Sequence, residues 1–330
     1  MKSSFPISVL TAALTALSIA PFPVMAAGEV LAWKRENGSV ALIQNAQVVW
    51  QFNFGTNAAP GANAIKPFFH PVALPGGPVL TWNQPPDHPW HHGLWFSWKF
   101  INGVNYWEGD RKTGRAQGLT SWTGPQIETR PDFSAHIDMD IRYHPATNAT
   151  SVLTEHRVIE ISPPGKDGAY RQDWTMIFTA GSEDVLLDRT PLPGEPGGQP
   201  YGGYAGLSVR LAAGITNAQA ITTTAREPVR FTDEMYRGAA TAMDYTGVFE
   251  DREAGIAILD CVSNLNSPSP WYAINGNPMH YFSPAVICHH PHTVKAGQQL
   301  ILRYQVIVHP GRWSAEQLGQ ASKHFPTFKP

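Results

Sequence analysis

Apolar and polar side chains alternate with a period of two along much of this chain, and the alternation restricts the folds open to it. In residues 134–143, for example, Ile137, Met139 and Ile141 fall on one face, and charged residues fall on the other. This period is typical of strands that bury one side. The alternation recurs in residues 152–161, 172–179, 207–212, 254–260 and 300–308. The chain is therefore expected to consist of β-strands.

Turn-forming residues separate these segments, since the chain has 29 glycines and 29 prolines. The Asn102-Gly103 pair predicts a two-residue hairpin turn, and the glycine-rich residues 191–203 predict a long loop. Residues 314–324 have a helical pattern, with Ser314 as the N-cap. With about fifteen strands and no clear linker, residues 27–330 are expected to form one all-β domain, a large two-sheet antiparallel β-sandwich.

The start of the chain has the composition of a secretory signal peptide, expected to cover residues 1–26. Lys2 supplies a positive charge, residues 7–20 are largely apolar, and residues 24–26 suit a cleavage site. No later run reaches the roughly 18 consecutive apolar residues of a membrane helix. The mature protein is therefore expected to be periplasmic or secreted, without a membrane span.

The charge of the chain is nearly balanced, with a formal net charge of −2 and no basic patch in the sequence. Because nucleic-acid binding needs such a patch, a nucleic-acid partner is not expected. The two cysteines, Cys261 and Cys288, both lie in apolar, strand-like segments. The sequence leaves open whether they form a disulfide or stay as buried thiols.

Histidines gather in one segment, where Asp87, His88, His91 and His92 follow two prolines and precede an aromatic run. Such a polar cluster is costly to bury unless it binds something. Imidazoles serve both as acid–base groups and as metal ligands. The spacing, broken by a proline, does not match a helical zinc motif. Acid–base roles are therefore expected, and a divalent metal held by His88, His91 and His92 stays an open alternative.

Aromatic residues crowd the same stretch. The flat face of a tryptophan suits the C–H face of a sugar ring as well as it suits a protein core. Trp95 and Trp107 continue strands, so packing is a strong alternative for them. Trp90, which lies between a proline and a histidine in a loop, is the best candidate for contact with a sugar.

Other side chains are assigned to the same site. Arg210 falls in an otherwise apolar strand and needs an anionic or carbonyl partner if it points inward. A carboxylate must accompany the histidines if they act on a glycosidic bond. The catalytic candidates are His91, His92, His88, Glu108 and Asp173. The substrate-binding candidates are Trp90, His70, Arg210, Asp87, His280 and Tyr281.

An ordered set of motifs resembles a known bacterial family. The motifs are residues 66–72, 87–96, 102–107, 203–210, 244–247 and 255–260. They resemble the family labelled PmoA or "methane oxygenase", which is elsewhere called a domain of unknown function. A membrane methane oxygenase subunit is built of membrane helices, which this sequence does not predict after the signal. The resemblance instead implies a secreted β-sandwich found among bacterial sugar-degrading systems, and a super-sandwich like that of galactose mutarotase is one form of this fold.

The histidine segment, its aromatic neighbours and this resemblance predict an exported carbohydrate-active enzyme. Its expected reaction is cleavage of a glycosidic linkage, by hydrolysis or elimination. The expected partner is a carbohydrate, and the cofactor is undetermined apart from the divalent metal left open above. Two alternatives remain, a non-catalytic carbohydrate-binding module and a mutarotase-like sugar epimerase.

Overall fold

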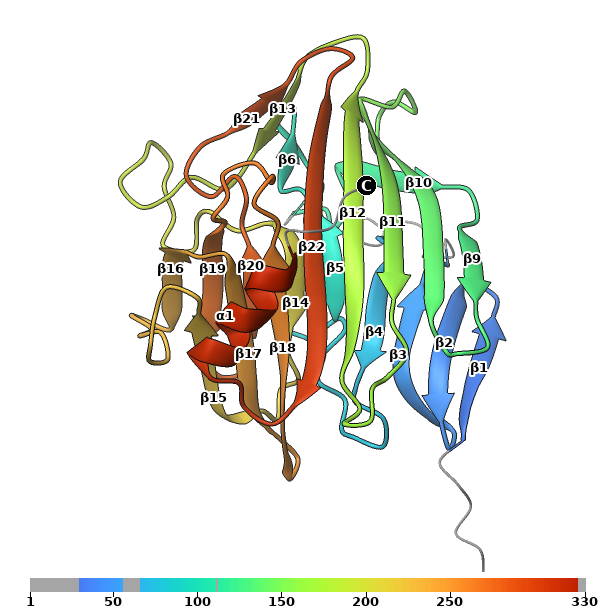
Figure 1. Ribbon diagram of the computed structural model, residues 1–330. Helices are drawn as coiled ribbons and strands as arrows, with labels where there is room; N and C mark the ends of the chain where they lie inside the picture. Colours follow the sequence, from blue (N-terminus) through green and yellow to red (C-terminus); the bar gives the residue numbers. More distant parts are fainter. Residues whose placement is uncertain (1–29, 56–65, 111, 326–330) are drawn as a thin grey trace, which may run out of the picture.

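The computed structural model describes residues 30–55, 66–110 and 112–325. In this part of the chain, two large antiparallel sheets pack face to face, with a small third sheet at one end and one helix (Figure 1). The predicted antiparallel β-sandwich is therefore confirmed. The signal peptide expected at residues 1–26 lies outside the described residues.

The first sheet has nine strands in the order β1-β2-β3-β4-β5-β14-β20-β19-β16. Their bounds are β1 Leu31–Glu36, β2 Ser39–Gln44, β3 Gln47–Asn53, β4 Phe68–Val72, β5 Leu94–Ser97, β14 Gly206–Arg210, β20 His280–Pro284, β19 Pro270–Asn275 and β16 Met235–Ala239. At its centre β14 pairs with β5 on one side and with β20 on the other. Segments from the two halves of the chain therefore lie next to each other there.

The second sheet runs β15-β17-β18-β22-β12-β11-β10-β8, and β9 also pairs with β10. Their bounds are β15 Thr216–Thr222, β17 Ala242–Phe249, β18 Arg252–Asp260, β22 Gln299–Pro310, β12 Tyr170–Ala180, β11 Leu153–Ile161, β10 Ala135–Pro145, β8 Gly118–Trp122 and β9 Gln126–Thr129. In β11 and β12, buried and more exposed side chains alternate almost throughout. The strands predicted from the period of two are thus confirmed here.

The core lies between the inner faces of these two sheets. Phe69 of β4 meets Trp174 of β12 edge-on, with 5.6 Å between ring centroids. Phe96 of β5 lies 5.2 Å from Phe178 of β12. Aromatic pairs at this spacing stabilise a core beyond the area that they bury. They hold the centre of the first sheet against β12.

The third sheet contains the predicted hairpin. Its order is β21-β13-β6-β7, with bounds β21 His292–Val294, β13 Val185–Asp188, β6 Phe100–Ile101 and β7 Val104–Asn105. Asn102 and Gly103 form the turn with φ angles of 51° and 77°. Two positive φ angles in succession are what a tight hairpin requires, and glycine and asparagine tolerate them best. The backbone amide of Leu186 also donates to the Asn102 side chain at 2.8 Å, which ties the turn to β13.

The helix α1 spans Ala315–His324 and begins where the sequence predicts. Ser314 is its N-cap and forms a capping box with Gln317. Leu318 is buried in an apolar cluster with residues of β17 and β18, so α1 covers part of the outer face of the second sheet (Figure 1). No described helix is long and apolar enough to cross a membrane.

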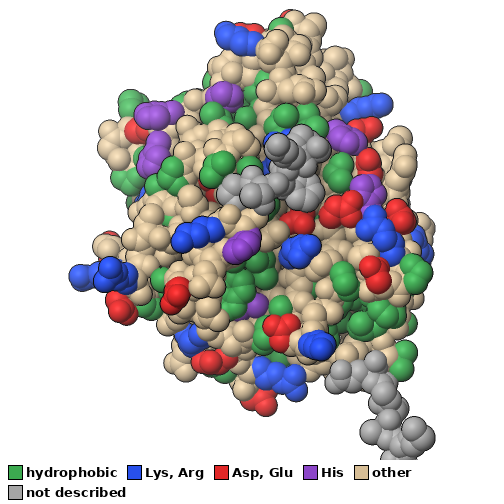
Figure 2. Space-filling model, viewed as in Figure 1, with side chains coloured by type: hydrophobic (Ala, Val, Ile, Leu, Met, Phe, Trp, Pro, Cys, Tyr) green, Lys and Arg blue, Asp and Glu red, His purple; other side chains and the backbone are tan. Residues whose placement is uncertain are grey.

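Charges of both signs share the face formed by the second sheet and α1. Figure 2 shows basic, acidic and histidine side chains interspersed on it. His136 pairs with Glu160 at 2.5 Å, and His156 pairs with Asp140 at 3.0 Å, each pair joining β10 to β11. The outward side chains of these two strands are thus linked to one another across the sheet.

Both cysteines are free thiols. Cys261 belongs to the apolar cluster under α1, whereas Cys288 belongs to a cluster on the outer face of the first sheet. The disulfide left open by the sequence is therefore not formed, because the two clusters lie on opposite sides of the sandwich.

The central strands of the first sheet are buried on both faces. In β5, β14 and β20 every residue is buried. Inward side chains such as Leu94 enter the core, whereas outward ones such as Trp95 and Tyr281 form a second apolar cluster. Loops pack against that cluster, for example through Trp90 and Leu192. The outer face of this sheet is therefore where a site can form beneath loops.

Two adjacent leucines of β13, Leu186 and Leu187, differ in burial, and substituting each of them tests which side chain stabilises the fold. Leu187 is fully buried in the core, whereas Leu186 is 40% exposed. Leu187→Ala is expected to lower the free energy of unfolding by about 2–5 kcal/mol, because it leaves a cavity. Leu186→Ala, the matched control, is expected to change it by less than about 1 kcal/mol. Urea unfolding followed by circular dichroism measures both, and equal losses would contradict this placement.

Candidate functional site

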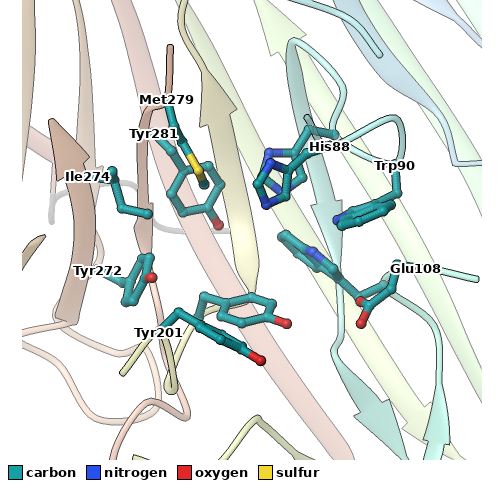
Figure 3. Close-up of a pocket in the computed structure, with 11 residues that line it drawn as sticks. His88, Trp90, Glu108, Tyr201, Tyr272, Ile274, Met279 and Tyr281 are labelled. Atoms are coloured by element: carbon teal, nitrogen blue, oxygen red, sulfur yellow. The ribbon is translucent and has the colours of Figure 1, made fainter. Parts of the chain in front are cut away.

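A cavity of about 280 Å³ lies on the outer face of the first sheet, over β19 and β20 (Figure 3). Its walls come from the segment before β5, the residues after β7, the loop before β14 and the β19–β20 hairpin. The lining residues are His88, Trp90, His91, Trp107, Glu108, Tyr201, Tyr204, Tyr272, Ile274, Met279 and Tyr281. Most of these side chains are aromatic, and the titratable groups that carry chemistry are two histidines and a glutamate.

His88 is oriented by an ion pair behind it, between the buried Arg210 and the more exposed Asp87. Nη2 of Arg210 donates to both carboxylate oxygens of Asp87, at 3.0 and 2.8 Å, and to the carbonyl of Pro278 at 3.1 Å. Nδ1 of His88 lies 2.9 Å from Oδ2 of Asp87. Because a carboxylate can only accept, Nδ1 carries the proton. Nε2 of His88 is then the atom that can take or give a proton.

The ion pair keeps Asp87 charged. Burial raises the pKa of Asp87, but hydrogen bonds from His88 and Arg210 outweigh it and hold the pKa below its usual range. Arg210 has no exposed surface, and burial lowers its pKa from the usual value. Its guanidinium also lies over the Trp82 ring, 5.3 Å from the centroid. Asp87 and Arg210 thus form a fixed support for His88.

His91 lies at the floor of the cavity and stays neutral. Its ring is 4.6 Å from that of His88, 5.2 Å from Trp95 and 5.4 Å from Tyr281, centroid to centroid. Burial, helped by the nearby charges of His88 and Arg210, lowers its pKa well below the usual value. Its Nδ1 is buried without a hydrogen-bond partner among the described residues. His91 is thus a neutral ring at the base of the site.

His92 points beneath the cavity and does not line it. Its ring stacks on Phe68 with 4.4 Å between centroids, and its Nδ1 lies 2.8 Å from Oδ1 of Asn83. Burial lowers the pKa of His92 well below its usual value, and the charge of Lys66 acts in the same direction. His92 therefore packs and positions the floor.

Glu108 brings a negative charge to the cavity. Its Oε1 pairs with Nζ of Lys99, and both side chains are buried. Its Oε2 is buried and has no hydrogen-bond partner within the described structure. Close by, Nζ of Lys66 donates to the carbonyl of Trp107 at 2.9 Å. Burial lowers the pKa of Lys66 to about 7, although the charge of Glu108 raises it. One carboxylate oxygen of this lining residue is thus buried without a hydrogen bond.

The two sides of the cavity differ in chemistry. In Figure 3, His88, Trp90 and Glu108 lie on one side, and Ile274, Met279, Tyr272 and Tyr281 lie on the other. The first we call the polar wall and the second the apolar wall. A bound molecule would thus meet proton-transfer groups on one side and apolar surface on the other.

A tied-down loop closes the end of the cavity. Tyr201 and Tyr204 come from the glycine-rich loop that the sequence predicts before β14. At its start, Nη2 of Arg189 donates to both oxygens of Glu195, at 2.6 and 2.8 Å. Arg237 of β16 donates to the Gly202 carbonyl at 2.8 Å. These bonds hold the tyrosines in place over the cavity.

The structure brings together most of the residues that the sequence assigns to the site. His88, His91, Glu108, Trp90 and Tyr281 line the cavity, and Asp87 and Arg210 support it from behind. His92 packs below, as described above. The grouping arises because β5, β14 and β20 are neighbours in one sheet.

Three assigned residues lie away from the cavity lining. His70 on β4 contacts Thr81 through Nδ1 at 3.0 Å. His280 on β20 contacts the Tyr245 hydroxyl at 3.1 Å. Asp173 lies on β12 of the second sheet, where it accepts from Gln305 at 2.6 Å. Asp173 is thus not brought to the site, because its side chain points to the outer side of the other sheet.

Sequence reasoning missed several residues of the site. Tyr204 and Tyr272 line the cavity, Lys99 pairs with Glu108, and Ile274 and Met279 form part of the apolar wall. For Tyr204, the only signal in the sequence was the unusual length of the loop before β14. The hydrophobic residues of β19 looked like ordinary core, because a strand buried on both faces shows no alternation.

The described residues contain no group of three or more His, Cys, Asp or Glu side chains that could hold a metal ion. His88 and His91 stack ring on ring, and His92 turns toward Asn83. The three histidines therefore do not converge on one point as metal ligands would.

Residues 39–323 match the model of a family of unknown function, DUF6807. No curated protein matches the chain in sequence.

Three solved structures are similar at low identity. The α-galactosidase from Lactobacillus brevis has a TM-score of 0.39 and 9% identity, over 88% of this chain and 40% of that one. A protein from Klebsiella pneumoniae subsp. pneumoniae, proposed to be an aldose 1-epimerase, has a TM-score of 0.36 and 7% identity, over 88% and 82%. Slr1438 from Synechocystis sp. PCC 6803 has a TM-score of 0.37 and 8% identity, over 88% and 100%. The chain thus spans about two fifths of the α-galactosidase.

The buried histidines predict a pH dependence of stability. Burial lowers the pKa of His70 and of His280 to about 4, from 6.5. Between these values the unfolded chain binds more protons than the folded one, so the free energy of unfolding falls as the pH drops from about 6.5 to about 4. Urea unfolding at pH 7 and pH 5 measures this fall. His280→Asn is expected to reduce it, whereas His156→Asn, at an exposed position of β11, should leave it unchanged.

Proposed function

Because the chain belongs to the DUF6807 family, whose function is unknown, we propose an activity from its site: a carbohydrate-active enzyme that cleaves a glycosidic bond in the cavity. The observation that carries the proposal is that an Asp87-supported His88 and the carboxylate of Glu108 line the same wall of an aromatic cavity. Sugar cleavage needs a proton donor and a negative group, and these residues supply both.

His88 is the proposed acid. Its Nδ1 is held by Asp87, so Nε2 is directed toward the leaving-group oxygen. A carboxylate behind an imidazole stabilises the protonated ring before it gives up its proton. Arg210 keeps Asp87 charged and fixes its position. Arg210 and Asp87 therefore act as positioning residues in this proposal.

Glu108 is the proposed negative group. Its Oε1 pairs with Lys99, and its Oε2 has no hydrogen-bond partner in the described structure. The transition state of glycoside hydrolysis develops positive charge on the sugar ring, and a nearby carboxylate stabilises that charge. The same carboxylate can activate the water that completes the reaction.

The shape of the cavity supports a sugar ligand. Its volume of about 280 Å³ is near the lower end of ligand pockets, which are roughly 300–1,000 Å³. Trp90 and Trp107 offer flat faces on which a sugar ring can stack. The cavity therefore suits a short glycoside rather than a long chain.

Hydrolysis fits this lining better than elimination does. Elimination removes a proton beside a carboxylate of the sugar, and that carboxylate needs a cation to bind it. Of the described residues that line the cavity, none is a lysine or an arginine. A neutral sugar and hydrolysis are therefore proposed.

Interconversion of sugar anomers is the second candidate. One histidine and one carboxylate suffice to protonate the ring oxygen and to deprotonate the anomeric hydroxyl. Glu108 is the one carboxylate among the described lining residues, whereas most glycoside hydrolases use two. The single carboxylate is the observation that supports an epimerase as the second candidate. Proton NMR of freshly dissolved glucose and galactose separates the two reactions, since only an epimerase speeds up mutarotation.

Export belongs to the same proposal. The signal-like composition of residues 1–26 supports a periplasmic or secreted enzyme formed by residues 27–330 as one unit. Fractionation of cells that express the full chain tests this, and protein confined to the cytoplasm would contradict it.

Glu108 and His88 are expected to be essential for turnover. A screen of the purified protein on glycans and glycosides, read by mass spectrometry, identifies a substrate. On it, Glu108→Gln and His88→Gln are expected to lower kcat at least about 100-fold, since each removes a proton-transfer or charge-stabilising group. Glu128→Gln and His156→Gln, on the exposed faces of β9 and β11, are the matched controls. Circular dichroism checks folding, and full turnover in a folded Glu108→Gln would overturn the assignment.

Trp90 separates an enzyme from a binding module. Trp90→Ala is expected to weaken substrate binding about 10-fold or more, because it removes a stacking face. Isothermal titration with the substrate found by the screen measures this loss. A module without activity would lose binding in the same way, but the wild-type protein would then release no product from any glycan that it binds.

A further inference from the structure

The apolar wall has little that a sugar can use. Ile274 of β19 and Met279 of the β19–β20 turn are aliphatic side chains without hydrogen-bonding groups other than the weak sulfur acceptor. They face the polar wall across the cavity (Figure 3). A sugar stacks on flat aromatic rings, whereas branched and flexible aliphatic chains pack against apolar groups of other shapes.

Three of the four tyrosine hydroxyls in the lining, those of Tyr204, Tyr272 and Tyr281, already have contacts. The Tyr281 hydroxyl lies 2.8 Å from Oγ of Ser208, and the Tyr272 hydroxyl lies 3.7 Å from the sulfur of Met235. The Tyr204 hydroxyl accepts from Thr190 at 3.4 Å. Since a buried sugar hydroxyl needs a partner, a second sugar ring would be poorly satisfied here.

Hydrogen-bonding capacity is concentrated on the polar wall instead. His88 has Nε2 free of the bond to Asp87, and Glu108 has a buried oxygen without a partner in the described structure. One sugar ring placed there can meet both groups and the face of Trp90. The rest of the ligand would then extend toward Ile274 and Met279.

From this division we propose that the substrate is a neutral glycoside with an apolar, aromatic aglycone, and that Ile274 and Met279 bind the aglycone. The inference rests on the proposed function for the identity of the sugar half. A flexible thioether and a β-branched side chain pack closely on an aryl ring, and sulfur–aromatic contacts add to the stabilisation. The lack of lysine and arginine in the described lining fits an uncharged ligand.

The test compares ligands that differ only in the aglycone. Phenyl and methyl 1-thioglycosides of glucose, galactose, mannose and xylose resist cleavage, so their dissociation constants report binding alone. Isothermal titration with the wild-type protein is expected to show at least one sugar for which the phenyl compound binds about 10-fold or more tightly than the methyl compound. Phenol alone should bind more weakly than that phenyl thioglycoside.

Variants of the apolar wall locate the aglycone. Ile274→Thr and Met279→Thr are expected to reduce the phenyl-to-methyl preference to about 3-fold or less. Ile301→Thr, on β22 of the second sheet, is the matched control and should keep the full preference. Because Thr is smaller and polar, it removes apolar contact without adding a charge.

The inference would be overturned by equal affinity for phenyl and methyl compounds, by no binding of any phenyl compound, or by a preference that both variants retain. Binding as tight by phenol as by the phenyl thioglycosides would overturn it too, since the sugar would then contribute nothing. Failure of the proposed function has a different signature. In that case the aglycone preference persists, but no glycoside in the activity screen is cleaved.

Discussion

The centre of the first sheet has to be covered on two faces. β5, β14 and β20 send one set of side chains into the core, and they send Trp95, Ser208 and Tyr281 to the outer face, where these are also buried. A sandwich of two sheets covers only the inner faces. The segment before β5 and the loop before β14 therefore form a further layer. Large, rigid aromatic side chains in that layer do not fill all the space, and the cavity lies between them.

Charged side chains around the cavity form ion pairs. Arg210 on β14 is joined to Asp87 in the loop, and Lys99 is joined to Glu108. Both members of the Lys99–Glu108 pair are buried, and loss of one partner of such a pair leaves an uncompensated charge, which costs about 3–5 kcal/mol. The first pair joins the segment before β5 to β14, and the second joins the segment after β5 to the segment after β7. The position of His88 follows from the first pair, and the position of the Glu108 carboxylate follows from the second.

The sequence predicts the strands of the second sheet better than the central strands of the first sheet. In β11 and β12 one face is buried and the other meets solvent, so the period of two is visible and the strands were predicted. In β5 and β20 both faces are buried, so burial does not alternate along these strands. Tyr272 on β19, which is also buried along nearly all its length, was not predicted as a site residue. The histidine segment was predicted to form a site because burying several polar groups costs free energy unless they bind something. Asp173, a catalytic candidate from the sequence, lies on the other sheet.

The sequence by itself determined the all-β class, the hairpin at Asn102-Gly103, the capped helix from Ala315 and the main histidine segment. These depend on side-chain period and on local backbone preferences, which neighbouring residues carry. Tertiary structure alone decided that Arg210 reaches Asp87, that Glu108 rather than Asp173 lies at the cavity, and that the cysteines stay apart. These outcomes depend on strand order, because pairing of β5, β14 and β20 brings together residues more than 180 positions apart, and no local pattern encodes that order.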